Sequence, residues 1–176
     1  MNAKDLERLL ASHGANPYGV DAVVRKLRES FKIPVSGRGF GAHDLTADEV
    51  SWIVVTYAGS ETAARAVETF TRLLKLRALD AEPQDFVVCF QLILRRDIKR
   101  FREIREIRIA RNADLAQIIF NEGAPWTFTN RRAPGAALPA FRSEGVLSAR
   151  LIELLAENVF LPKDRDDGPP IEAEDE

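Results

Sequence analysis

The chain has 176 residues, of which 45% are hydrophobic and 30% are charged, and its net charge is −2 at pH 7. This balance is typical of a globular protein with a buried core, and no apolar run approaches the ~20 residues of a membrane-spanning helix. The first 14 residues form a charged amphipathic pattern unlike a secretory signal, so we expect a cytoplasmic protein without a membrane partner. The single cysteine, Cys89, lies in an apolar segment, and we expect a buried structural thiol.

The charge is unevenly distributed along the chain. Residues 163–176 hold seven acidic and two basic side chains, a net charge of −5, which leaves +3 on residues 1–162. Two prolines and a glycine accompany these charges, so we predict an acidic disordered tail over 163–176. The mildly basic remainder is compatible with a nucleic-acid partner but does not require one.

Two helices are predicted at the start of the chain. A leucine stripe over residues 6–10 marks the first helix, which Gly14 closes in the manner of a C-terminal cap. The turn segment GANPYG (14–19) follows. From residue 20 to about 31, apolar side chains recur at i, i+3, i+4 and i+7. This spacing predicts a second, amphipathic helix with a largely basic opposite face.

Two further helices are predicted in the N-terminal region. Thr46 and Glu49 have the spacing of a capping box, so a third helix begins at about Ala47 and Gly59 stops it. A fourth helix is expected from about 61 to 79 because its apolar residues keep helical spacing.

The segment DAEPQD (80–85) is the one plausible internal boundary. It separates residues 1–79 from a smaller α/β region over 84–162. The following FVVCFQLIL fits a buried helix or a strand by periodicity, and we favour a helix because Pro83 suits a first helical turn.

Strands are predicted in the second region. Segments 104–109 and 115–120 flank the turn NAD and predict a β-hairpin, and PWTFTN (125–130) adds a third strand. The pattern returns to a helix from Val146 to Phe160. The predicted fold class is therefore α+β and mainly α.

Three glycines surround an arginine in SGRGFG (36–41), and this segment allows three interpretations. A phosphate-binding loop would need a terminal Lys-Ser/Thr and a preceding strand, and neither is present. A flexible linker fits poorly, because the flanking helices are too short to be stable alone. Helix, turn, basic helix, glycine-rich hairpin and capped helix is the order of a winged helix-turn-helix domain. We therefore predict a recognition helix over about 20–31 and a wing over 34–44, with Arg38 at its tip.

The stretch VVRKLRESFKIPVSGRGFGAHDLTADEVSWI (23–53) resembles the MerR-type winged-helix pattern. In that family a recognition helix ends in Leu-Arg, an Ile/Leu-Pro step enters a basic wing, and Leu-Thr-x-(Asp/Glu)-Glu opens the next helix. The glycine-rich wing is also similar to that of small DNA-binding proteins from prophage and gene-transfer-agent clusters. The resemblance covers roughly the first 60 residues and implies a DNA-binding regulator.

Two departures from the family limit what the resemblance implies. Glu29 and Ser30 replace the aromatic pair that usually follows the Leu-Arg element. The long C-terminal dimerisation helix and the cysteines of metal-sensing members are also absent from the sequence. We therefore do not expect a metal sensor, and the mode of dimerisation stays open.

Candidate DNA contacts lie on the second helix and in the glycine-rich segment. A charged helix face is by default solvated surface, but the wing that follows favours DNA contact for Arg25, Lys26 and Arg28. Asn16 is explained equally well as a turn residue before proline. His43 could bind a phosphate, but a turn-stabilising surface histidine explains it better. The full set of candidates is Asn16, Tyr18, Arg25, Lys26, Arg28, Lys32, Ser36, Arg38 and His43.

A second basic cluster spans residues 95–111, where eight bases face three acids. Alternating signs are typical of a solvated surface with local ion pairs. The surplus of positive charge also makes the cluster a candidate for extra phosphate contacts or for holding the acidic tail. Its bases are Arg95, Arg96, Lys99, Arg100, Arg102, Arg105, Arg108 and Arg111.

The sequence contains no recognisable catalytic motif. His13 and His43 lack a cysteine or a second histidine at ligand spacing, so no zinc site is predicted. The motifs of serine hydrolases and zinc proteases are missing as well. We expect a protein that is not an enzyme and that holds neither a metal nor another cofactor.

The predicted function is that of a sequence-specific, prophage-type transcriptional regulator that binds double-stranded DNA. We expect a homodimer in which 84–162 mediates dimerisation or contacts other transcription proteins, because a dimer doubles a small interface on a palindromic site. The alternative is a phage-type DNA-packaging recognition subunit, similar to a small terminase, which would form a ring of many copies. A third class is a protein-interaction module that has lost DNA binding.

Overall fold

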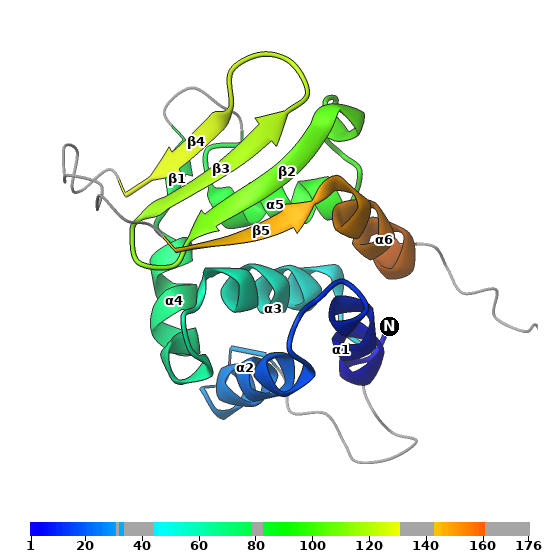
Figure 1. Ribbon diagram of the computed structural model, residues 1–176, viewed down its shortest axis with the longest axis vertical. Coiled ribbons are helices and arrows are strands. Elements are labelled where there is room, and N and C mark those ends of the chain that lie inside the picture. Colours follow the sequence, from blue (N-terminus) through cyan, green and yellow to red (C-terminus); the bar gives the residue numbers. More distant parts are fainter. Residues whose placement is uncertain (31, 34–43, 79–82, 131–142, 161–176) are drawn as a thin grey trace, which may run out of the picture.

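The computed structural model describes residues 1–30, 32–33, 44–78, 83–130 and 143–160. The protein mixes helix and sheet, is about half helical and contains one small antiparallel sheet, which confirms the predicted class at this level (Figure 1). Within the described ranges, no helix combines the length and the apolar character needed to cross a membrane.

Four helices precede the sheet, and the first three begin at a capping side chain. Asn2, Asn16 and Thr46 each accept hydrogen bonds from N–H groups of the first helical turn that lack an intrahelical partner. The predicted capping box is present, since Thr46 N–H donates to Glu49 Oε2 at 2.6 Å and Glu49 N–H donates to Thr46 Oγ1 at 3.2 Å. These helices are α1 (Ala3–Ala11), α2 (Pro17–Glu29), α3 (Ala47–Gly59) and α4 (Ala66–Leu73).

The remainder of the chain builds a five-stranded sheet with two helices. Neighbouring strands follow the order β1-β4-β3-β2-β5, and every pair is antiparallel. The predicted hairpin is β2–β3, the predicted third strand is β4, and the segment FVVCFQLIL is a helix as expected. The elements are β1 (Arg77–Ala78), α5 (Phe86–Leu94), β2 (Ile104–Ala110), β3 (Leu115–Phe120), β4 (Trp126–Thr129), β5 (Glu144–Ser148) and α6 (Ala149–Phe160).

The sheet buries one face against α5. Ile107 pairs with Ile118 in the β2–β3 register, and both side chains are fully buried. The ring of Phe86 on α5 meets the ring of Phe128 on β4 edge to face, with 5.3 Å between the centroids. Arg108, one position along β2 from Ile107, is only half-buried, as the two-residue period of a strand requires.

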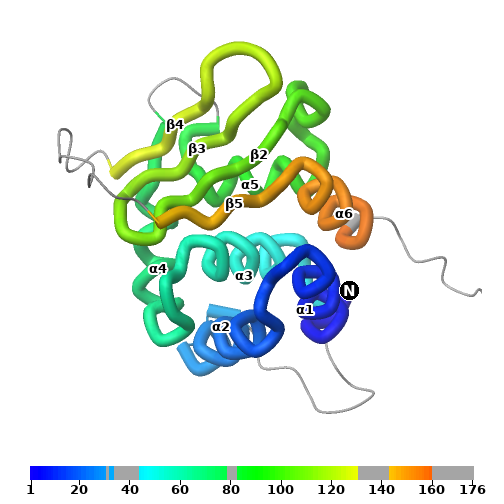
Figure 2. The backbone as a smooth tube through the Cα atoms, in the orientation of Figure 1, coloured from blue at the N-terminus to red at the C-terminus, as the bar shows by residue number. Residues whose placement is uncertain are grey.

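Helix α3 lies at the centre of the molecule. Nine of its 13 residues are buried, because α2 and α4 pack against it from one side and α5, α6 and β5 from the other (Figures 1 and 2). The approach of β5 is close: a Cβ atom on Gly145 would lie 2.1 Å from the carbonyl oxygen of Ala58. Buried side chains from both sides of the 80–85 segment consequently form one hydrophobic cluster.

Two predicted helices are shorter than expected. The predicted helix over 61–79 is a 3-10 turn at Ala63–Arg65 followed by α4, and residues 77 and 78 instead pair with β4. The predicted start of the last helix at Val146 was wrong, because this residue lies in β5 opposite Arg108. In both places pairing with a distant strand outweighs the local helical pattern, a tertiary effect that periodicity does not report.

Candidate nucleic-acid interface

The first turn of α2 is fixed at two points. The side-chain oxygen of Asn16 accepts hydrogen bonds from the N–H groups of Tyr18 at 3.0 Å and Gly19 at 3.4 Å. The backbone N–H of Asn16 in turn donates to the hydroxyl of Tyr57 on α3 at 2.8 Å. Asn16, a predicted DNA contact, thus has a defined structural role as a helix cap, while the residue itself stays exposed.

The outward face of α2 carries three of the predicted contacts. Tyr18 is 85% exposed, and Arg25 and Lys26 are exposed as well. Arg25 pairs with Asp21 and Lys26 pairs with Glu29 at 2.7 Å, both on the same helix. Exposed pairs of this kind contribute only about 0–1 kcal/mol. Both cations are therefore free to exchange these partners for a phosphate or a base at small cost.

Arg28 and Lys32 differ in their accessibility. Arg28 is half-buried, and its Nε is buried without a hydrogen-bond partner among the described residues. Lys32 is exposed, and its backbone N–H closes the end of α2 by donating to the carbonyl of Leu27 at 2.9 Å. Of the predicted basic contacts on α2, Arg25 and Lys26 are thus the more accessible ones.

Three predicted contacts, Ser36, Arg38 and His43, lie outside the described residues, as does almost all of the predicted wing. The described residues on both sides are anchored in the core. Ile33 is 2% exposed, and Leu45 is buried with its N–H donating to the carbonyl of Met1 at 2.9 Å.

Most bases of the second basic cluster are paired, two of them with acids on distant helices and three with acids nearby in the chain. Arg95 pairs with Asp48 of α3 at 2.9 Å, and Arg96 pairs with Glu157 of α6 at 3.4 Å. Arg100 pairs with Glu103, lies over the ring of Phe120 and donates to the carbonyl of Glu122. Arg105 and Arg108 share Glu106. Among the described residues, Lys99 and Arg102 are the members that make neither an ion pair nor a hydrogen bond to a carbonyl.

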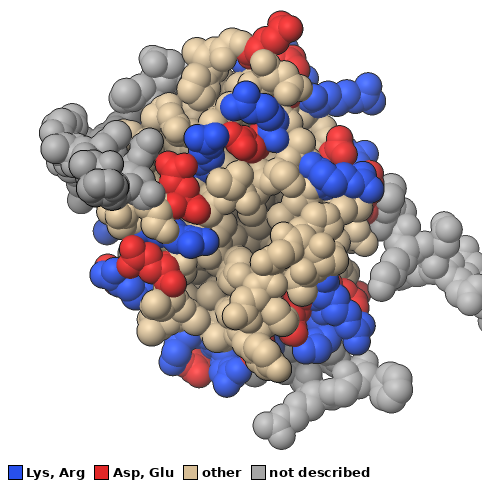
Figure 3. All heavy atoms as spheres, in the orientation of Figure 1, with Lys and Arg blue, Asp and Glu red and all other residues tan. Residues whose placement is uncertain are grey.

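Basic side chains reach the surface near α1 and α2 as well. The space-filling view shows lysine and arginine along the lower edge, over these two helices, with acidic side chains among them (Figure 3). The surface over α2 is therefore mixed in sign. Residues 17–32 hold four described bases against two acids, so positive charge is in excess.

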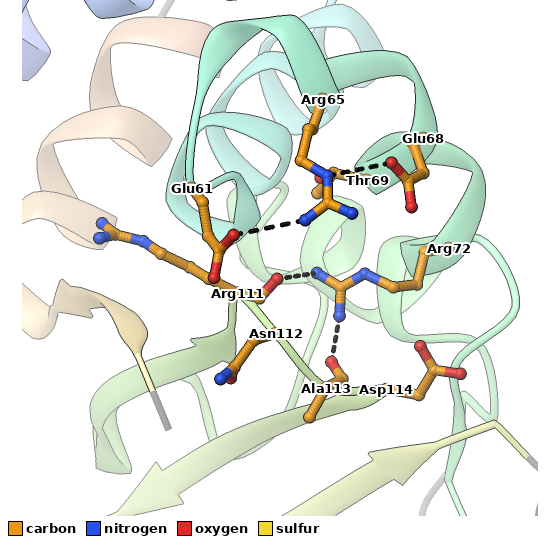
Figure 4. Close-up of a pocket in the computed structure, with 9 residues that line it drawn as sticks. All are labelled: Glu61, Arg65, Glu68, Thr69, Arg72, Arg111, Asn112, Ala113 and Asp114. Carbon is orange, nitrogen blue, oxygen red and sulfur yellow. Dashed lines mark hydrogen bonds and ion pairs between the residues drawn. The ribbon is translucent and has the colours of Figure 1, made fainter. Parts of the chain in front are cut away.

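Arg72 was missed by the sequence analysis, although it lies in a cavity of about 210 Å³ (Figure 4). Its guanidinium donates to four carbonyls, those of Gly59, Ala110, Arg111 and Ala113, and so joins the end of α3 to the β2–β3 turn. Burial lowers the pKa of Arg72 below its ordinary value, an effect that Asp114 opposes. Because the donors of Arg72 are used by backbone carbonyls, its role is to stabilise the fold. The sequence does not reveal this role, since an arginine on the polar side of a helix is usually exposed to solvent.

The nucleophile and metal chemistry of the described residues is limited. Cys89 is buried as expected, and burial raises the pKa of its thiol to about 12. At neutral pH this thiol is protonated and therefore unreactive. Among the described residues, no group of three or more histidine, cysteine, aspartate or glutamate side chains is arranged to hold a metal ion.

The exposed face of α2, with Tyr18, Arg25 and Lys26 on a helix fixed by Asn16, is the arrangement best suited to a large anionic partner.

No family model matches the chain, and neither the curated proteins nor the solved structures give a significant match.

Proposed function

We propose that the chain is a DNA-binding transcriptional regulator of the MerR-like winged helix-turn-helix type, acting in the cytoplasm. Helix α2 is its recognition helix, and residues 34–44 form its wing. The observation that carries the proposal is the placement of α2, which packs against α3 (Figure 1). Its apolar residues are buried, while Tyr18, Arg25 and Lys26 are exposed. The order of elements and the 23–53 motif support the same reading.

In this proposal α2 enters the major groove. Tyr18 in the first helical turn and Arg25 two turns later lie on one face of the helix, the spacing at which both reach base edges. Lys26 lies beside Arg25 and contacts the phosphate backbone. On binding, the guanidinium of Arg25 exchanges Asp21 for the two acceptors of a guanine, and such a contact discriminates against the other bases by about 1–3 kcal/mol.

The test begins with selection of bound duplexes from a random library, followed by fluorescence anisotropy on the selected and scrambled sequences. Arg25→Ala should weaken binding to the selected duplex by about tenfold or more, and weaken binding to the scrambled duplex much less. Arg150→Ala is the matched control, because Arg150 is also exposed on a helix and pairs with Glu153 at 3.6 Å. No enrichment in the selection, or equal losses for both variants, would contradict the proposal.

The wing makes a separate contribution that the same assay resolves. Arg38→Ala should weaken binding to both duplexes evenly and reduce the slope of log affinity against log salt by roughly one unit, as expected for a phosphate contact.

The proposal includes a homodimer on DNA, because two copies double a small interface and match a palindromic site. Native mass spectrometry of the complex with the selected duplex measures the number of copies. Two copies per duplex agree with a regulator, whereas a ring of many copies would favour the DNA-packaging alternative.

A further inference from the structure

A second cavity, of about 260 Å³, lies between the first turn of α2, the end of α3 and the β2–β3 turn. It adjoins the cavity around Arg72, since Glu61 and Arg111 line both. Its polar lining residues are Asn16, Tyr57, Ser60, Glu61, Thr62 and Arg111. Three parts of the fold that are distant in sequence therefore meet at one small polar space.

Ser60 is the residue that points to a ligand. It is only 8% exposed, and its hydroxyl is buried without a hydrogen-bond partner among the described residues. Burying a hydroxyl without a partner costs free energy, and such groups are uncommon in native proteins. Ser60 lines the adjoining cavity, but its hydroxyl is shielded from it in the free chain, so a ligand there would remove this cost once the Ser60 side chain rotates toward it.

Other donors around the cavity are also unused. The hydroxyl of Tyr57 accepts from the Asn16 N–H, so its own proton is free to be donated. Thr62 occupies an N-cap position but makes no side-chain cap bond. Arg111 donates through Nε to the carbonyl of Ala58 at 3.1 Å, which leaves its two terminal nitrogens without acceptors among the described residues.

The lining favours an anion. Its charged residues are Arg111 and Glu61, so its formal net charge is zero. Glu61 is engaged by Arg65 at 3.4 Å, whereas the terminal nitrogens of Arg111 have no acceptor among the described residues, so unused hydrogen-bond donors rather than an excess of charge favour an anion. The anion would not bind to free backbone N–H groups at the N-terminus of α2, because the N–H groups of Tyr18 and Gly19 already donate to the Asn16 side chain.

We propose that this cavity binds a small oxyanion, a carboxylate or a phosphate group, held by the hydroxyls of Tyr57, Ser60 and Thr62 and by the guanidinium of Arg111. Each of these groups can donate a hydrogen bond, and the charged oxygens of a carboxylate or a phosphate accept such bonds. The volume lies just below the roughly 300–1,000 Å³ of ordinary ligand pockets, which restricts the ligand to a small molecule or to the charged end of a larger one.

The test follows backbone amide NMR shifts of the full chain during titration with inorganic phosphate, and in a second series with succinate, at constant ionic strength with chloride. The site requires saturable shifts at Gly19, Tyr57, Ser60 and Thr62. The series that saturates at the lower concentration identifies phosphate or carboxylate as the preferred group.

Two variants make the test specific. Ser60→Ala removes a hydroxyl that has no partner in the free chain, so it should fold as well as the wild type. It should nevertheless weaken binding by about tenfold, the effect of one hydrogen bond to a charged group. Thr56→Val is the matched control, because Thr56 also buries an unpartnered hydroxyl on α3 but does not line the cavity.

Saturation in the wild type and in Thr56→Val, with weaker binding in Ser60→Ala, supports the site. Equal binding by Ser60→Ala and the wild type overturns it. Shifts that never saturate, or that spread evenly over surface lysines and arginines, overturn it as well. Such shifts reflect general screening of surface charge rather than binding in the cavity. This readout needs no DNA, so the site can fail while the proposed DNA binding stands.

Discussion

The hydroxyl of Tyr57 accepts a hydrogen bond from the backbone N–H of Asn16 at 2.8 Å, and this bond joins the start of α2 to the middle of the molecule. Tyr57→Phe removes the acceptor and should lower the free energy of unfolding by about 1 kcal/mol in urea titrations. Tyr18→Phe is the control, because Tyr18 is 85% exposed and its change should stay within about 0.5 kcal/mol. Equal effects of the two substitutions would show that the bond contributes nothing measurable.

Asn16 allows its structural role to be separated from a role in DNA binding. Asn16→Ala removes the cap and should cost about 1 kcal/mol of stability, whereas Asn16→Asp keeps a capping oxygen and should be nearly neutral. If Asn16 lies beside DNA, the added negative charge of Asn16→Asp should still weaken binding in the anisotropy assay. Unchanged affinity for Asn16→Asp would confine Asn16 to the capping role.

Gly145 lies where a side chain does not fit. The nearest atom to an added Cβ is the backbone oxygen of Ala58, which cannot move without shifting α3. Gly145→Ala should therefore destabilise the protein by about 3 kcal/mol or more, at the upper end of overpacking effects. Thermal unfolding monitored by circular dichroism measures this, with Val146→Ala, an exposed change on the same strand, as the control. A loss no larger than that of Val146→Ala would contradict the close approach of β5 to α3.

The buried thiol of Cys89 should make the protein less stable at alkaline pH. Burial raises the pKa of its thiol from 9.0 to about 12, so below pH 9 the thiol is neutral in both states and adds no pH dependence. Above pH 9 only the unfolded chain loses the proton, and the free energy of unfolding falls by up to about 1.4 kcal/mol per pH unit.

The measurement compares the wild type with Cys89→Ala in urea titrations at several pH values. The stability difference between the two proteins should be constant up to about pH 8 and should decrease by about 1 kcal/mol at pH 10. Other groups that titrate in this range affect both proteins alike. A difference that stays constant to pH 10 would mean that the thiol reaches solvent.

The two proposals together predict that the oxyanion and DNA oppose each other. Asn16 and Gly19 line the cavity, and Tyr18 between them faces the proposed DNA surface. A bound anion there repels the duplex, so phosphate should lower DNA affinity several-fold beyond the effect of chloride at equal ionic strength. DNA must then lower phosphate affinity by the same factor. Ser60→Ala should abolish the difference between phosphate and chloride, and its persistence in that variant would place the competition elsewhere.

Features set by local sequence could be predicted. The Thr46–Glu49 box, the amphipathic stripe of α2 and the β2–β3 hairpin each depend on residues close in the chain, and each is present in the structure. Cys89 was assigned to the interior because all but one of the residues of its segment, Phe86–Leu94, are apolar.

Features set by distant contacts could not be predicted. Val146 has an apolar neighbour pattern that suits a helix, and only the pairing of its strand with β2 makes it extended. Nothing in the sequence around Arg72 or Ser60 distinguishes them from ordinary surface residues. Both become buried or bonded only because the end of α3 packs near the β2–β3 turn. The ion pairs of Arg25 with Asp21 and of Lys26 with Glu29 are different, because their i,i+4 and i,i+3 spacing is local and could have been predicted from the sequence.

The burial of most of α3 between the other helices and the sheet has a consequence for how the molecule opens. Neither the helices on one side nor the sheet on the other can detach without exposing an apolar surface of α3 to water, so partial opening costs nearly as much as complete unfolding. The amides of α3 should then exchange with solvent only through global unfolding, at the slowest rate in the chain. A fragment ending near residue 79 would keep α2 but leave α3 bare along one side, and such a fragment would aggregate rather than serve as a smaller version of the protein.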